Sequence, residues 1–274
     1  MGVQGPLARS SEDLEVGLRA IAGPDIGEDV AWRLELPPPR ARTLADFRVA
    51  VMPRVEWLPV STEILDALET LASRLSRAGA RVAVTQPEPF GDMREHHALY
   101  ISFLTAVTSA PLTPEQRERL ARFDPANDET GWGTARARAL SAGVPDWLVM
   151  HARREEYRRA YREFFRDWDI VLAPITLRTA FPHIDMPWPA PDDARPNMIE
   201  IDGQAHLYGD QVVYPGLATL SGQPATAFPV GLSASGMPIG LQAIGPYLED
   251  YTPIRLAALA SEQMGGFVRP PGYD

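Results

Sequence analysis

Phe47-Arg48-Val49-Ala50-Val51-Met52 and Arg81-Val82-Ala83-Val84 are short runs rich in β-branched residues, and both are typical of strands. Between them, residues 61–78 place apolar side chains at helical spacing, and Gly79 ends that pattern. A strand, a helix and a second strand in this order indicate an α/β fold in which a parallel crossover is the default.

The rest of the chain adds helices and strands on both sides of this unit. A helix capped by Ser10 or Ser11 is predicted to run to about Ala22, and residues 93–167 are mostly helical in pattern. Three further apolar runs predict strands, at residues 170–173, 226–230 and 239–244, the last two as a hairpin or tight strand pair. A final helix covers about residues 250–264. We therefore predict an α/β fold with a mixed central sheet flanked by helices.

Charge and composition exclude several classes of protein. The 274 residues carry a net charge of −10, which argues against a general nucleic-acid or anionic-membrane binder. In the helix predicted after Pro145, six arginines are matched by six acidic residues, which indicates an ion-paired solvent face rather than a nucleic-acid stripe. No apolar run approaches the length of a membrane span, and the N-terminus lacks the features of a secretory signal. We expect a cytoplasmic protein.

The basic residues constrain the chemistry further, because all 26 are arginines and none is lysine. A Schiff base, a P-loop lysine and a Ser–Lys catalytic pair are therefore impossible within these residues. Arginine cannot replace lysine as a general base, because its guanidinium stays protonated near neutral pH. There is no cysteine either, which excludes disulfides and thiol catalysis.

Metal and phosphate motifs are weak. His96 and His97 are adjacent, so on a helix they point about 100° apart and cannot share an ion by themselves. Residues 131–133, Gly-Trp-Gly, lack the third glycine of a dinucleotide-binding loop, and no Gly-x-Ser-x-Gly elbow occurs. We expect neither a metal nor a cofactor.

Four stretches carry a pattern of glycine, proline and polar residues that points to one family. They are Gly5-Pro6-Leu7-Ala8-Arg9-Ser10 with Asp13, Asp169-Ile170-Val171-Leu172-Ala173-Pro174-Ile175-Thr176, Gly222-Gln223-Pro224-Ala225 with Pro229-Val230-Gly231, and Gly236-Met237-Pro238-Ile239-Gly240-Leu241-Gln242-Ala243-Ile244-Gly245. In this order they resemble motifs of the amidase-signature family, and the resemblance covers essentially the whole chain.

The resemblance implies a reaction class, the hydrolysis of a small carboxylic amide to an acid and ammonia or an amine. In the family, a Ser–Ser–Lys relay and a glycine-rich oxyanion hole carry out this reaction. Both lie upstream of the stretch that Gly5-Pro6 begins here. We therefore expect residues 1–274 to be the C-terminal part of one incomplete amidase-signature domain, with no catalytic residue of its own.

Loops at the carboxyl ends of strands carry the sites of α/β folds, so the turn after residues 170–173 is the best place for substrate contact. The candidate substrate-binding residues are Ala173, Pro174, Thr176 and Asp210. Gln242, on a buried strand, is better explained as a core amide whose hydrogen bonds are satisfied than as a catalytic group.

Three hypotheses for the function follow. The first is a catalytically incomplete amidase-family chain that is inactive alone. The second is half of a split amidase, completed by a polypeptide that supplies the N-terminal catalytic half. The third is a non-catalytic ligand-binding or interaction protein that has kept the substrate pocket. An amidotransferase A subunit is a less attractive hypothesis, because nothing in the sequence indicates contact with tRNA.

Overall fold

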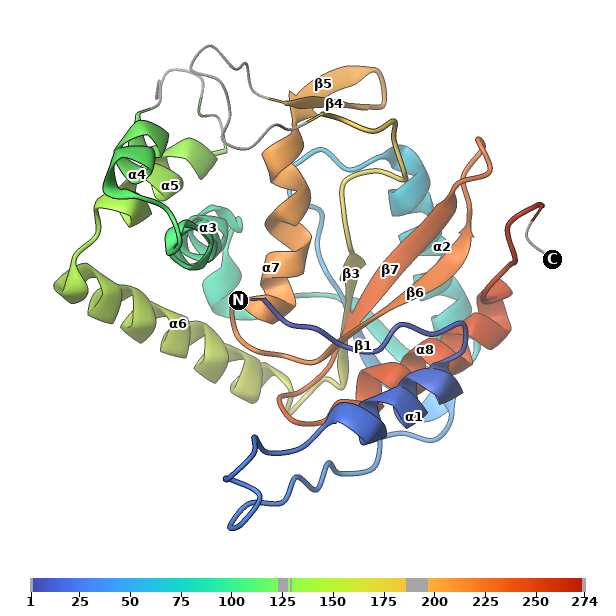
Figure 1. Cartoon of the computed structure of the whole chain (residues 1–274). Helices are drawn as coiled ribbons and strands as arrows, with labels where there is room; N and C mark the ends of the chain where they lie inside the picture. Colours follow the sequence, from blue (N-terminus) through green and yellow to red (C-terminus); the bar gives the residue numbers. More distant parts are fainter. Residues whose placement is uncertain (1, 123–127, 129, 186–196, 273–274) are drawn as a thin grey trace.

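The computed structural model describes residues 2–122, 128, 130–185 and 197–272 (Figure 1). Five strands form a mixed sheet in the order β2-β1-β3-β7-β6. They are β1 (Arg48–Val51), β2 (Arg81–Val84), β3 (Ile170–Pro174), β6 (Ala225–Leu232) and β7 (Pro238–Ile244). β1 runs parallel to β2 and β3, whereas β7 runs antiparallel to both of its neighbours. All five predicted strands are present, and the predicted mixed sheet is confirmed.

The burial of each strand follows its residue pattern. β3 is a continuous apolar run, and all five of its residues are buried at the centre of the sheet. β6 lies at the sheet edge and alternates: Thr226, Phe228 and Val230 are buried, whereas the residues between them are more exposed. One face of β6 therefore packs on the core and the other does not.

One face of the sheet is covered by α2 (Thr62–Arg77) and α8 (Tyr251–Met264) (Figure 1). The buried stripe of α2 comprises Ile64, Leu68, Leu71 and Leu75, and Ser61 precedes its first turn as predicted. α1 (Ser11–Ile21) packs on α8, and the hydroxyl of Ser10 accepts a hydrogen bond from the Asp13 amide at 3.1 Å. The predicted cap of this helix is thereby confirmed.

Most of the remaining helices gather beside the sheet (Figure 1). They are α3 (Arg94–Ser109), α4 (Pro114–Ala121), α5 (Trp132–Ser141), α6 (Val144–Phe164) and α7 (Val213–Thr219). α7 stands between α3 and the centre of the sheet (Figure 1). Among the helices of the described ranges, none combines the length and the hydrophobicity that a membrane span requires.

A buried carboxylate joins the connector before β1 to the centre of the sheet. Asp169, just before β3, contacts Arg48 at 2.6 Å and Arg40 at 3.5 Å. Burial alone would raise the pKa of Asp169, but hydrogen bonds from Arg48 and the charges of both arginines hold it below its ordinary value. Arg40 also forms a two-pronged contact with Glu249, so the connector, the residue before β3 and the segment before α8 meet at one guanidinium.

A second, two-stranded sheet was not predicted from the sequence. It pairs β4 (Met198–Ile201) with β5 (Gln204–Leu207), and a short helical turn, η4 (Tyr208–Val212), follows and leads into α7. This segment carries Asp210 to the carboxyl-terminal edge of the main sheet, next to the turn that follows β3.

Candidate functional site

The turn after β3 and the η4 turn are joined by one glutamine side chain. The hydroxyl of Thr176 donates to the side-chain oxygen of Gln211, and the amide of Leu177 donates to the same oxygen at 2.8 Å. Gln211 directly follows Asp210 in η4. The structure thus brings together the two segments that hold the sequence-predicted residues, although Leu177 and Gln211 are 34 residues apart in the chain.

Gln242 joins β3 to α7 through its side chain. Its side-chain nitrogen donates to the carbonyl of Pro174 at 2.8 Å and to that of Tyr214 at 3.0 Å. The prediction that Gln242 is a core amide with satisfied hydrogen bonds is confirmed. Ala173, its partner in the ladder, is fully buried, and Pro174 is buried as well. Thr176 is half-buried, so it is the member of this group that reaches the surface.

Asp210 lies in η4 with only 3% of its surface exposed. The preceding residue, Gly209, faces the indole of Trp132 in α5, and a β-carbon there would lie 3.3 Å from the ring. A glycine at this position therefore lets η4 approach α5 closely. Asp210 is consequently held at the junction of α5, α7 and the turn after β3.

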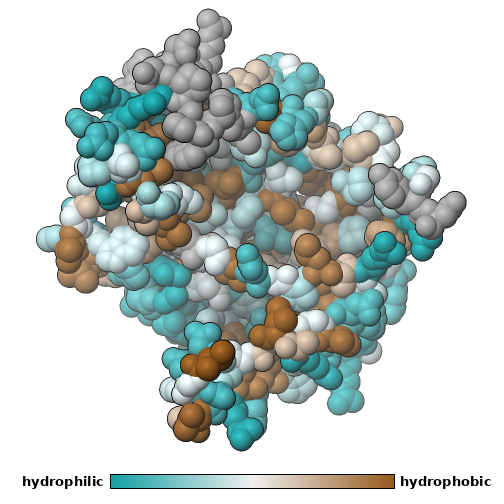
Figure 2. Space-filling view, viewed as in Figure 1, coloured by the Kyte–Doolittle hydropathy of each residue, from teal (hydrophilic) through white to brown (hydrophobic). Residues whose placement is uncertain are grey.

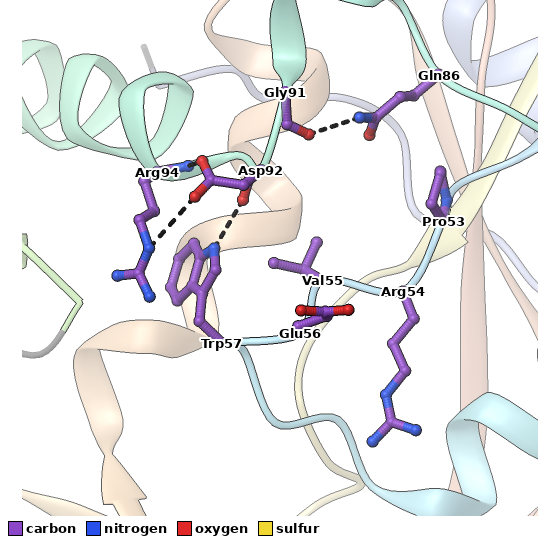
Figure 3. A pocket seen from close by; sticks show the side chains of 9 residues that line it. All are labelled: Pro53, Arg54, Val55, Glu56, Trp57, Gln86, Gly91, Asp92 and Arg94. Carbon is purple, nitrogen blue, oxygen red and sulfur yellow. Dashed lines mark hydrogen bonds and ion pairs between the residues drawn. The ribbon is translucent and has the colours of Figure 1, made fainter.

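A cavity of about 490 Å³ opens at the carboxyl ends of β1 and β2, the same edge of the sheet (Figure 3). Its walls are the two loops that follow these strands, and they consist of Pro53, Arg54, Val55, Glu56, Trp57, Gln86, Gly91, Asp92 and Arg94. The loops are joined by a hydrogen bond from the Trp57 indole to the Asp92 carbonyl at 2.7 Å. The Arg94 guanidinium stacks 4.7 Å from the centre of the Trp57 ring.

The cavity is coupled electrostatically to α7 through Arg54. Burial raises the pKa of Tyr214 to about 12, and the positive charge of Arg54 opposes that rise. Tyr214 is the residue whose carbonyl accepts from Gln242. This cavity was not predicted from the sequence, although the rule that predicted a site after β3 applies equally to the carboxyl ends of β1 and β2.

The adjacent histidines are both buried and lie in different surroundings. His96 packs edge-on against Phe90 and Tyr157, whereas the ring of His97 lies 6.1 Å from that of Trp57. Burial lowers the pKa of His96 to about 3 and that of His97 to about 4, so both are neutral at physiological pH. Within the described ranges, no three His, Asp or Glu side chains are grouped closely enough to hold a metal ion.

The arrangement brings polar and charged side chains to one edge of the main sheet. Thr176 and Gln211 present a hydroxyl and an amide, and Arg54 and Glu56 add opposite charges on exposed side chains beside the cavity. Such groups fix the orientation of a polar molecule.

Comparison with known proteins gives one consistent result. The sequence profile of the family described as Amidase matches residues 1–253. Indoleacetamide hydrolase of Bradyrhizobium japonicum is 25% identical over 250 residues, which are 91% of this chain and 50% of that protein. The A subunit of the glutamyl-tRNA(Gln) amidotransferase of Rubrobacter xylanophilus is 28% identical over 292 residues, covering 96% of this chain and 55% of the relative.

Solved structures show the same fold. A 6-aminohexanoate cyclic dimer hydrolase superposes with a TM-score of 0.65 at 20% identity, covering 94% of this chain and 54% of the other. A bacterial aryl acylamidase of the amidase-signature enzymes superposes with a TM-score of 0.63 at 20% identity, covering 94% and 52%. The chain therefore spans about half the length of the relatives it matches. On the match along residues 1–253, this chain belongs to the amidase family.

Proposed function

We propose that these 274 residues form the C-terminal half of an amidase, a single incomplete domain that contributes substrate contacts to the hydrolysis of a carboxylic amide. The observation that carries this proposal is the match to the family over residues 1–253, together with coverage of about half of each relative. A chain that aligns almost end to end with half of a longer enzyme shares the architecture of that half.

A second part of the proposal is that these residues do not hydrolyse amides by themselves. A Ser–Ser–Lys relay needs a neutral side-chain amine as its base, and none of the 26 basic residues is lysine. The catalytic groups then come from the other half of the amidase, whether it belongs to the same polypeptide or to a separate one. The amidotransferase relative is by its name one subunit among others, which supports a polypeptide partner.

Within this half, Thr176 and Asp210 are proposed to contact the substrate, and Ala173 and Pro174 to shape the turn beneath it. Support comes from Gln211, which binds the turn after β3 and directly follows Asp210. The substrate class is a small-molecule amide, and indoleacetamide is the first compound to test because two relatives are named for its hydrolysis. The net charge of −10 supports a protein that binds neither nucleic acid nor anionic membranes, and a cytoplasmic location is part of the proposal.

The test measures ammonia release from indoleacetamide and from a panel of aliphatic and aryl amides, with a fluorophosphonate probe for reactive serines. For the chain alone we expect no release above buffer and no labelling. Turnover by the chain alone, with one serine labelled per molecule, would overturn the proposal.

A second arm adds the half of the Bradyrhizobium japonicum hydrolase that this chain does not span. We expect ammonia release to appear in the mixture and Thr176→Val to weaken it, because the substitution keeps the shape of the side chain and removes its hydroxyl. The matched control is Thr219→Val, in α7, whose hydroxyl bonds to the Pro215 carbonyl of its own helix. If the mixture binds an amide but never hydrolyses it, the chain is a ligand-binding protein instead.

A further inference from the structure

The cavity between the loops after β1 and β2 contains two positive and two negative side chains, and only one of each is neutralised within the protein. The Asp92 carboxylate accepts from the Arg94 amide at 3.0 Å and contacts the Arg94 guanidinium at 3.4 Å. The side chains of Arg54 and Glu56 form no ion pair or hydrogen bond with another described residue. Figure 3 shows Arg54 across the cavity from Arg94, with no interaction drawn to it. Arg54 and Glu56 therefore carry the charges that a ligand can meet.

The rest of the cavity wall is held in place by hydrogen bonds within and between the two loops. The Trp57 indole donates to the Asp92 carbonyl at 2.7 Å, and the side-chain nitrogen of Gln86 donates to the Gly91 carbonyl at 2.6 Å. The side-chain oxygen of Gln86 can still accept a hydrogen bond from a ligand. The volume of about 490 Å³ lies within the range of about 300–1,000 Å³ that is usual for small-molecule sites. The cavity is therefore a pre-formed site for a small polar molecule.

Arg54 and Thr176 follow neighbouring strands, so one small molecule can contact both. β1 and β3 are adjacent and parallel, and their carboxyl ends therefore meet at one edge of the sheet, with about 4.8 Å between the strands. The loop after β1 then returns to the turn after β3, where the Ser61 amide donates to the Leu177 carbonyl at 2.7 Å. The cavity and the candidate substrate-binding turn are neighbouring parts of one site.

The charge of Arg54 acts toward α7, which borders the same site. Burial raises the pKa of Tyr214 in α7, and the positive charge of Arg54 acts against that rise. Interactions between charges weaken with distance, so the guanidinium lies on the α7 side of the cavity. The space-filling view shows hydrophobic residues around a hollow near the middle of the face on which α7 and β3 lie in Figure 1 (Figure 2). A ligand on this side meets apolar side chains and the positive charge of Arg54.

We propose that the cavity binds a carboxylate of the substrate through Arg54, and that the substrate is a small amide with this carboxylate at the end remote from the amide group. The inference rests on the proposed function and names the class of amide that this half holds. A guanidinium presents its N–H donors in a planar fork that matches the two oxygens of a carboxylate. Val55 and Trp57 give the carbon chain between the two groups an apolar wall.

The test compares three amides of similar length and different charge, because Glu56 would favour a cation where Arg54 favours an anion. They are succinamate, which is anionic, succinamide, which is neutral, and β-alaninamide, which is cationic. Ligand-observed NMR titrations of the purified chain at about 50 mM salt should show that succinamate binds at least about tenfold more tightly than the other two. Arg54→Gln should abolish this preference, and Glu56→Gln should not reduce it.

The matched control is Arg162→Gln, which removes the same charge from an exposed arginine of α6 that does not line the cavity. It should keep the full preference for succinamate. Because Arg54 is exposed as well, the thermal melts of both variants should match the wild type. The inference is overturned if none of the three amides binds, if succinamide or β-alaninamide binds as tightly as succinamate, or if Arg54→Gln keeps the preference.

A second arm separates this inference from the proposed function by measuring ammonia release. It mixes the chain with the half of the Bradyrhizobium japonicum indoleacetamide hydrolase that the chain does not span. A chain that prefers succinamate through Arg54, in a mixture that releases no ammonia from any amide, would contradict only the proposed function. Ammonia release that is equally fast from succinamate and succinamide, and that Arg54→Gln leaves unchanged, would contradict only this inference.

Discussion

His96 gives the molecule a built-in sensitivity to acid. The side chain is fully buried, and among the described residues neither ring nitrogen has a hydrogen-bond partner. Burial, assisted by the neighbouring His97, lowers its pKa from 6.5 to about 3. Below about pH 6.5, His96 therefore binds a proton in the unfolded chain but stays neutral in the folded chain. The free energy of unfolding should fall between pH 6.5 and 3, by about 1.4 kcal/mol per pH unit for this residue.

His96→Phe tests this, because it keeps an aromatic ring against Phe90 and Tyr157 and removes the titration. Urea unfolding at about pH 7, 6 and 5 should show a shallower pH slope, with His97 supplying the part that remains. The exposed His183, changed to Gln, is the control and should leave the slope as it is. An unaltered slope in His96→Phe would show that the proton uptake lies elsewhere.

Gln242 links the end of β3 to α7 beneath the candidate site through its side-chain amide. Its amide nitrogen satisfies two carbonyls, those of Pro174 and Tyr214, in a side chain that is 5% exposed. Gln242→Leu leaves both carbonyls without this donor, and each buried unpaired group costs about 1–3 kcal/mol. We expect the free energy of unfolding to drop by about 2–4 kcal/mol. The exposed Gln204→Leu should change it by less than about 0.5 kcal/mol in the same urea titration.

The β4–β5 hairpin stabilises a helix that lies far from it in the sequence. Its turn consists of Asp202 and Gly203, both with positive φ, of 47° and 81°. The carboxylate of Asp202 accepts from the Thr62 amide at 2.8 Å and from the Thr62 hydroxyl at 2.7 Å, at the first turn of α2. The helix is thus capped by another element rather than by its own preceding residue.

Asp202→Ala removes the cap and places an unfavoured residue at positive φ, so we expect a loss of about 1–2 kcal/mol of stability. Asp202→Asn keeps an acceptor oxygen and tolerates the backbone angle, so it should stay close to the wild type. Thermal melts of the two variants separate these cases. Equal melting temperatures for both would mean that the cap contributes nothing.

The elements that the sequence predicted are those with a strong local pattern. Residues 170–173 form a central strand because they are apolar without interruption, and Ser10 caps α1 through a contact three residues away. The β4–β5 hairpin was missed, although Asp202-Gly203 directly after alternating isoleucines is a recognisable turn signal. α7 was missed because its seven residues include a proline and a glycine, which disfavour helix.

For the candidate site as well, features with a local sequence pattern could be predicted and features that depend on distant contacts could not. The turn after β3 was predicted to be a site from the rule for strand ends, which is local, and that prediction remains to be tested. The cavity beside Trp57 depends on the approach of two loops, and the hydrogen bond between Trp57 and Asp92 spans 35 residues. Neither loop alone has a pattern that would reveal it.

The charge of the whole molecule allows a prediction about partners. The chain has a net charge of −10, so polyanions should repel it when all orientations of the molecule are averaged. We expect no sedimentation with vesicles that contain phosphatidylserine, and no change in the anisotropy of labelled duplex DNA, at about 50 or 150 mM salt. Binding that weakens steeply between the two salt concentrations would reveal a local basic surface that outweighs the net charge.

The order of strands in the sheet also determines when the sheet can form during synthesis. Val49 pairs with Ile170, and Val171 pairs with Ile244, so the central strand β3 joins one early and one late segment of the chain. β1, α2 and β2 leave the ribosome before β3 does, so β1 has an open strand edge throughout the synthesis of the helices from α3 to α6. Contacts so distant in sequence form slowly, and nascent chains with unpaired edges are prone to misassociation. We therefore expect the nascent chain to be more prone to misassociation in this interval than a protein whose neighbouring strands are consecutive.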